Sequence, residues 1–160
     1  MCRGTHPANV GLVAPIAALL GAGLADAGVV YEVGPGRAHE TPLTVPWAEL
    51  GPGDEVRIHA RPEPYRAKWV IGRSGTAEAP IVVRGVASAD GTLPVIDGRE
   101  APTATGLDYW GGHRSVLKIG GSNVPPDSVP RHIVIEGLHL RGAAPSHRFT
   151  DRDGAVREYS

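Results

Sequence analysis

The chain has 160 residues, which suits one domain with a single core. Only 5% of its residues are aromatic and it holds 22 glycines and 15 prolines, so turns must be frequent and the core must rely on Val, Ile, Leu and Ala. Long helices are therefore not expected. The formal net charge of -1 argues against bulk neutralisation of phosphates, and we expect no nucleic acid partner.

Residues 1–27 have the order of a signal peptide. A basic start precedes an uncharged, mostly apolar run over residues 10–24, and Ala25 and Ala27 then form a small-x-small cleavage motif. The run is shorter than the roughly 20 apolar residues of a spanning helix, so we expect no stable membrane insertion. Cleavage after Ala27 predicts a secreted or periplasmic protein; an uncleaved anchor or a buried helix is the alternative. The only cysteine, Cys2, would leave with the signal.

Residues 28–55 are expected to cap the fold. Residues 29–33 alternate as a strand does, and a proline at the first helical position favours one helical turn over residues 47–50. The first coil of a solenoid has an unpaired edge and an open core, which a cap would cover. We interpret Trp47 and Leu50 as packing residues of that cap rather than as groups that stack on a ligand.

Short β-branched runs recur between turn residues over residues 56–160, and we interpret them as coils of a parallel β-solenoid. Val56 and Ile81 are 25 positions apart and Val95 and Val116 are 21 apart, which brackets the repeat of a coil that carries two or three short strands. Alternation within the runs predicts that one set of side chains points inward: Ile58, Val83, Ile119, Ile135, Leu138 and Leu140. Of these, we expect Ile58, Val83, Ile119 and Ile135 to be buried in one stack.

The order of these segments resembles a known family. It comprises Gly-Asp-Glu-Val at residues 53–56, Ser-Gly-Thr-x-x-x-Pro-Ile at 74–81, Pro-Val-Ile-Asp-Gly at 94–98 and His-Ile-Val-Ile-Glu-Gly-Leu at 132–138. It is similar to the N-terminal coils of secreted, pectin lyase-like, right-handed parallel β-helix proteins, including polysaccharide lyases that resemble chondroitinase B and alginate lyase. The resemblance covers about residues 50–145. It implies an all-β fold, a right-handed parallel β-helix, and it rests on scaffold motifs rather than catalytic ones.

The resemblance also implies where the chemistry lies. Members of that family carry their catalytic base and calcium ligands on later coils, so no catalytic residue, metal ligand or cofactor is expected in this segment, although calcium is possible in a full-length protein. We interpret the chain as the N-terminal fragment of a longer solenoid. The alternative is a short relative that needs a partner to cover its open C-terminal edge.

Candidate substrate-binding residues come from two sources. Elimination across a uronic acid needs a cation near the carboxylate, and four outward side chains could line one such groove: Arg84, Lys118, His139 and Arg141. Tyr109 and Trp110 lie in a polar loop and could stack on a sugar ring. The alternatives are that the charged groups only keep the solenoid soluble, and that the aromatic pair covers the side of the stack.

Asp151 and Asp153 look like the start of a calcium loop, but the later ligands of that pattern are absent. Asp153 and Gly154 between residues 147–150 and 155–159 are better explained as the turn of a β-hairpin.

Three functions remain open at this stage. The chain is the N-terminal part of an exported enzyme acting on polysaccharide, of the lyase kind; or a non-catalytic β-helix that binds glycan or a cell surface; or a purely structural solenoid segment. A fold alone cannot select among them, because one scaffold hosts many activities.

Overall fold

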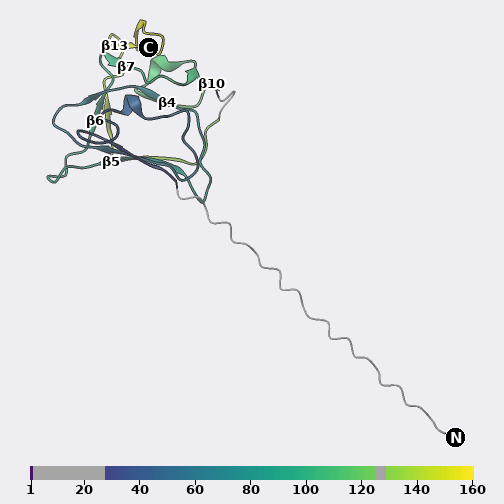
Figure 1. Cartoon of the computed structure of the whole chain (residues 1–160). Coiled ribbons are helices and arrows are strands. Elements are labelled where there is room, and N and C mark those ends of the chain that lie inside the picture. Colours follow the sequence, from purple (N-terminus) through teal and green to yellow (C-terminus); the bar gives the residue numbers. More distant parts are fainter. Residues whose placement is uncertain (2–27, 125–128) are drawn as a thin grey trace.

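The computed structural model describes Met1, residues 28–124 and residues 129–160 (Figure 1). The predicted signal peptide and its cleavage motif at Ala25 and Ala27 therefore lie outside the described residues. Within the described part there is no α-helix, and no helix there has the length and apolar character that crossing a bilayer would require.

The strands stack in parallel into three sheets, each built from successive passes of the chain. The first sheet has the order β1 (Val30–Val33), β2 (Glu55–His59), β5 (Ile81–Val86) and β11 (Ile133–Glu136). The second has the order β12 (His139–Arg141), β6 (Val95–Asp97) and β3 (Tyr65–Arg66), and the third pairs β4 (Trp69–Ile71) with β9 (Leu117–Ile119). Figure 1 shows β5, β6 and β4 on different sides of one closed outline. The predicted all-β parallel β-helix is confirmed.

Two smaller sheets lie beside this stack. β13 (Arg148–Thr150) pairs in parallel with β7 (Ala101–Pro102) and antiparallel with β14 (Val156–Glu158), while β8 (Asp108–Tyr109) pairs antiparallel with β10 (Ser122–Val124). The hairpin predicted around Asp153 and Gly154 is thus confirmed, and Gly154 has the positive φ of 84° that its turn requires. The described 3₁₀ helices are η1 (Pro42–Thr44) and η2 (Gly112–Arg114).

The cap at the N-terminal end forms partly as predicted. β1 adds to the first sheet, and Trp47 and Leu50 are buried. Trp47 stacks on Trp69 with ring centroids 5.1 Å apart, and its Nε1–H donates to the Pro42 carbonyl at 2.7 Å. The helical turn predicted over residues 47–50 is wrong, because residues 47–49 form a hydrogen-bonded turn and the helical segment is η1, before it.

The core is made of inward-facing rows that run from coil to coil. One row contains Tyr31, Val56, Val83 and Ile135, which are partners on adjacent strands of the first sheet. Val56 and Val83 are completely buried, whereas Ile135, on the last strand of the row, is only half-buried. Burial therefore decreases toward the C-terminal end of the stack.

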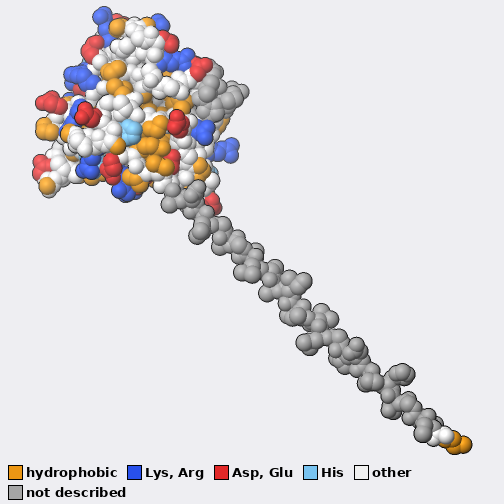
Figure 2. All heavy atoms as spheres, in the orientation of Figure 1, with side chains coloured by type: hydrophobic (Ala, Val, Ile, Leu, Met, Phe, Trp, Pro, Cys, Tyr) orange, Lys and Arg blue, Asp and Glu red, His pale blue; other side chains and the backbone are white. Residues whose placement is uncertain are grey.

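The C-terminal end of the stack leaves apolar side chains exposed. Ile119 is the register partner of the buried Ile71, and Leu140 is that of the buried Ile96, yet they are 48% and 42% exposed. The expectation that Ile119 is buried with Ile135 in one stack is wrong, since Ile119 belongs to the third sheet and no described coil covers it. Figure 2 shows charged side chains of both signs interspersed over one face of the folded residues.

Candidate ligand-binding site

The candidate site is built around a tight turn that follows β8. Gly111 has a φ of 64°, in the left-handed region that side chains disfavour, and a Cβ at Gly112 would lie 2.9 Å from Cε2 of Tyr109. The backbone N–H of Trp110 donates to the Gly121 carbonyl at 3.1 Å, which ties the turn to the chain beside β10. The two glycines are therefore needed for the turn that presents Trp110.

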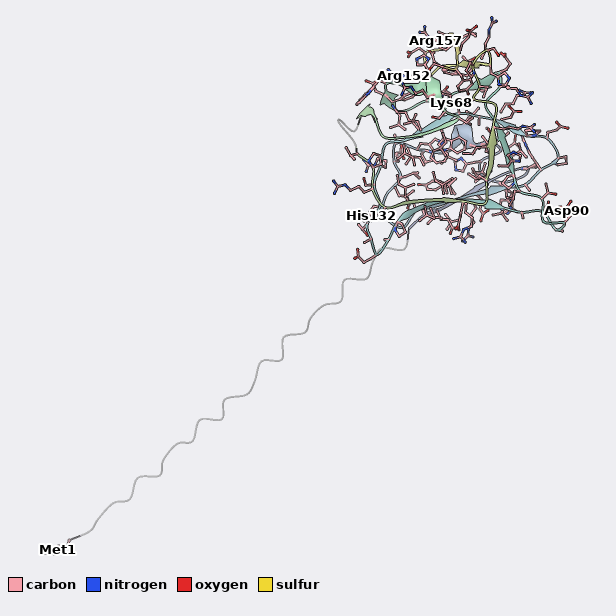
Figure 3. All side chains as sticks on the ribbon, turned by 180° about the vertical axis from the view of Figure 1, so that it is seen from behind. Met1, Lys68, Asp90, His132, Arg152 and Arg157 are labelled. Atoms are coloured by element: carbon pink, nitrogen blue, oxygen red, sulfur yellow. The ribbon has the colours of Figure 1, made fainter. Side chains whose placement is uncertain are left out.

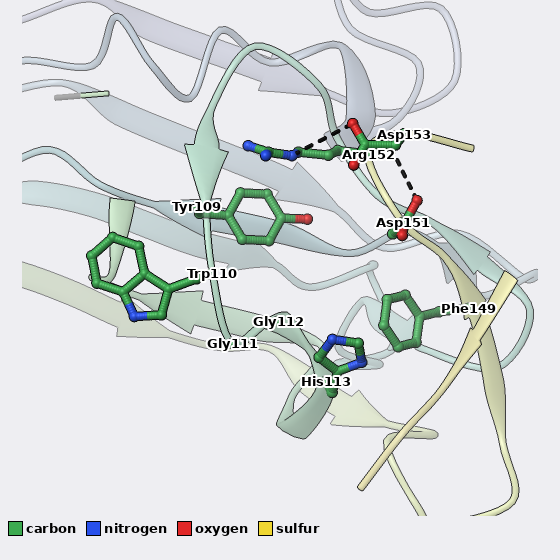
Figure 4. A pocket seen from close by; sticks show the side chains of 9 residues that line it. All are labelled: Tyr109, Trp110, Gly111, Gly112, His113, Phe149, Asp151, Arg152 and Asp153. Atoms are coloured by element: carbon green, nitrogen blue, oxygen red, sulfur yellow. Dashed lines mark hydrogen bonds and ion pairs between the residues drawn. The ribbon is translucent and has the colours of Figure 1, made fainter. Parts of the chain in front are cut away.

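Two cavities flank this turn and share Trp110, Gly111 and His113. The aromatic cavity encloses about 290 Å³ and is lined by Tyr109, Trp110, Gly111, Gly112, His113, Phe149, Asp151, Arg152 and Asp153 (Figure 4). The cationic cavity encloses about 490 Å³ and is lined by Trp110, Gly111, His113, Arg114, Lys118, Gly121 and Ser160. The second volume falls within the range of ordinary small-molecule sites.

The cationic cavity holds two positive groups. Lys118 Nζ donates to the carbonyls of Trp110 and Gly121, the latter at 3.1 Å, and lies 5.3 Å from the centroid of the Trp110 ring. Burial lowers the pKa of Lys118. Within the described part of the chain, neither Lys118 nor Arg114 forms an ion pair with a carboxylate. Two cations without a described carboxylate partner therefore line the cavity, and Trp110, which is 51% exposed, offers a flat apolar surface at its edge.

The polar groups of the aromatic cavity are largely occupied. Asp151 accepts hydrogen bonds from the backbone N–H groups of Asp153 and Ala155 and from Nε of Arg157 at 2.8 Å. Arg157 also lowers the pKa of the Asp151 carboxyl. This carboxylate therefore stabilises the β13–β14 hairpin. In the described ranges, no group of three or more His, Cys, Asp or Glu side chains is placed to hold a metal ion.

Of the six predicted substrate-binding residues, the structure brings together Tyr109, Trp110 and Lys118. Arg84 lies on the outer face of the first sheet, where its Nε is 2.8 Å from Glu136 Oε1.

The other two predicted residues, His139 and Arg141, lie on β12 in the second sheet. Nε of Arg141 lies 3.0 Å from Oδ2 of Asp97. The single groove of Arg84, Lys118, His139 and Arg141 is therefore not formed, because these residues belong to three different sheets.

Arg114, which lines the cationic cavity, was not singled out from the sequence. It was visible only as the end of a Gly-Gly-His-Arg loop, and its place beside Lys118 depends on η2 and on the turn at Gly121. The adjacent glycines were the available signal, since they mark a backbone that must turn sharply before the arginine.

A buried lysine lies next to the site. Lys68, labelled in Figure 3, is completely buried. Its Nζ donates to the Ser115 carbonyl and lies 4.8 Å from the ring centroid of Phe149 and 5.3 Å from that of Tyr159. No described carboxylate pairs with it. Burial first, and the charge of Lys118 second, lower the pKa of Lys68 to about 8.

We expect the free energy of unfolding to rise by about 2 kcal/mol between pH 8 and pH 10. The pKa of Lys68 is lower in the folded state, so the unfolded state binds more protons in this window and stability increases with pH. Above pH 10 the gain is opposed by Tyr159, whose pKa burial raises to about 12. Urea unfolding at several pH values measures the slope. Lys68→Met should remove most of it, and an unchanged slope in this variant would contradict the assignment.

No protein-family model matches the chain, and no curated protein and no solved structure matches it. The comparisons therefore add no activity or ligand to the resemblance noted from the sequence, and the architecture of parallel sheets is the part of that resemblance that the structure supports.

Proposed function

We propose that this chain belongs to an exported β-helix protein that acts on polysaccharide, and that its described residues bind an acidic glycan at the cationic cavity. The observation that carries the proposal is the exposed Trp110 ring beside Lys118 and Arg114, two cations without a carboxylate partner in the described part of the chain.

The arrangement suits a uronic acid unit. The apolar face of a sugar ring stacks on an exposed tryptophan, and the carboxylate of the same unit accepts charge-assisted hydrogen bonds from Lys118 and Arg114. Lys118 needs little reorganisation, because two backbone carbonyls already hold its Nζ in place. Both cations are partly solvated, so affinity should be modest and should fall as salt concentration rises.

If the full-length protein is a lyase-like enzyme, we propose that the residues that cleave the polysaccharide lie on further parallel coils. The inward-facing but exposed Ile119 and Leu140 support such coils, since another coil would bury them and pair the free edges of their strands. A non-catalytic glycan-binding β-helix would use the same cationic cavity. Incubation with chondroitin, alginate or pectate, followed by absorbance of the unsaturated product, separates the two functions.

Trp110→Ala is expected to weaken binding of a carboxylated polysaccharide about tenfold, equivalent to about 1.4 kcal/mol, through loss of the stacking surface. Lys118→Ala should weaken it similarly and should flatten the salt dependence. Calorimetric titration with alginate or pectate oligomers measures both effects. The matched control is Arg84→Ala, which removes a surface cation that Glu136 already neutralises.

Equal affinity of the wild type and Trp110→Ala would show that the glycan does not contact this turn. Loss of binding in Arg84→Ala alone would move the site to the first sheet.

A further inference from the structure

The outer face of the second sheet carries a cluster of arginines around one buried carboxylate. Asp97, at the end of β6, is 1% exposed and accepts hydrogen bonds from Arg99 Nη2 at 2.6 Å and Arg141 Nε at 3.0 Å. Its Oδ1 also accepts from the Arg99 backbone N–H at 3.0 Å. A side chain at Gly142 would overlap Asp97 Oδ1, so a glycine there lets the two coils close around the carboxylate.

The strand register adds a third arginine. Arg66 is the partner of Asp97 on one side, and Arg141 is its partner on the other, so the three residues form one outward row across three coils. Neighbouring strands lie about 4.8 Å apart, which places the backbones of Arg66 and Arg141 about 10 Å apart. Arg66 Nη1 donates to the Arg99 carbonyl, so it lies against the same turn.

The cluster is not electrically balanced. Arg99 and Arg141 share the single carboxylate of Asp97, whereas Arg66 donates to the Arg99 carbonyl. Among the described residues, no other carboxylate forms an ion pair with any of the three arginines. The side chains of Arg99 and Arg141 are 46% and 43% exposed, and Arg66 is exposed. Nη1 of Arg99 and both Nη groups of Arg141 have no partner among the described residues, so these donors are available to a ligand.

We propose that Arg66, Arg99 and Arg141 bind a tetrahedral oxyanion, namely the sulfate or phosphate group of a ligand. Guanidinium groups present planar forks of N–H donors that match such oxygens, and a tetrahedral group can accept from donors that converge from several directions. Asp97 fixes the orientation of two of the three forks, which reduces the entropy lost on binding. The site lies on a different sheet from the cationic cavity, so it stands independently of the proposed function.

The test is titration of the protein with inorganic sulfate and, separately, with inorganic phosphate, followed by NMR of the arginine Nε–Hε signals. We expect saturable shifts at Arg99 and Arg141 that an equal ionic strength of chloride does not produce. Arg66→Ala should weaken binding at least fivefold. It leaves the ion pairs of Asp97 with Arg99 and Arg141 in place, so the fold is retained. Arg66→Lys should retain part of the affinity, because lysine supplies the positive charge but not the planar fork of N–H donors.

Arg84→Ala is the matched control. It removes an exposed arginine that lies on another sheet and already has two acidic partners, Glu55 and Glu136. Equal affinity in the wild type and Arg66→Ala, or the same loss in Arg84→Ala, would overturn the proposal. So would shifts that chloride reproduces. Binding of a sulfated polysaccharide but not of a sugar phosphate would identify the oxyanion as a sulfate ester, and the reverse result would identify it as a phosphate. If the protein binds the inorganic anions but neither of these ligands, the proposal that the site takes the sulfate or phosphate group of a larger ligand is overturned.

Discussion

Replacing Asp97 with alanine is expected to lower the free energy of unfolding by about 3 kcal/mol. The substitution removes four hydrogen bonds to Arg99 and one to Arg141, and it leaves two guanidinium groups facing each other across neighbouring coils. Hydrogen bonds to charged groups contribute about 1.5–3 kcal/mol each, but the arginines are nearly half exposed and water compensates part of the loss. Urea unfolding of both proteins measures the difference.

The matched control is Glu158→Ala, which breaks an exposed ion pair with Arg148 on the β13–β14 hairpin. Surface pairs of this kind contribute at most about 1 kcal/mol. Equal stability of the wild type and Asp97→Ala would show that the two coils are held together without this carboxylate.

The same residue gives the protein an acid dependence of known sign. Arg99, foremost, and Arg141 hold the pKa of the Asp97 carboxyl well below its usual range in the folded state. The contribution to stability is thus fully present above the ordinary Asp pKa of about 4 and is lost as pH falls below it, because the unfolded state then binds the proton first. Asp97→Asn should show a smaller loss of stability between pH 4 and pH 2.

Sequence patterns predicted the strands better than their assignment to sheets. Alternation identified Ile58 and Val83 as inward, and both are completely buried. They nevertheless lie in different rows, since Ile58 pairs with Gly85 and Val83 pairs with Val56. Ile119, also predicted to point inward, lies in another sheet. A period of two residues separates inward from outward side chains, but it carries no information about the register of neighbouring strands or about the sheet that a strand joins.

The same lack of information on sheet and register explains which residues of the candidate sites could be predicted. Tyr109, Trp110 and Lys118 were identifiable by residue type, and a single loop that closes at Gly121 brings them together. The arginine cluster was not predictable in this way. Arg66 is separated by many positions from Arg141, and only the register of the second sheet sets both beside one carboxylate.

Val83→Asp is expected to unfold the protein, whereas Ile135→Asp is expected to be tolerated at a cost of about 1–2 kcal/mol. The two residues are register partners in one row, so both variants introduce the same carboxyl group at the same position of a coil, on two adjacent coils. Val83 is completely buried between Val56 and Ile135, and a carboxyl there has no hydrogen-bond partner and no path to water. Loss of apolar burial and desolvation of the carboxyl together exceed about 4 kcal/mol, a large part of the stability of a typical domain.

Ile135 differs because no described coil covers this end of the stack. It is half-buried, and the exposed Leu140 and Ile119 show that other inward-facing side chains at this end also reach solvent. A carboxylate at Ile135 can therefore stay hydrated. Circular dichroism and thermal unfolding of both variants measure the contrast at protein concentrations from micromolar upward. If Ile135→Asp unfolds the protein as completely as Val83→Asp, then the apolar end of the stack is covered in solution, and a further coil or another protein must bury Ile135.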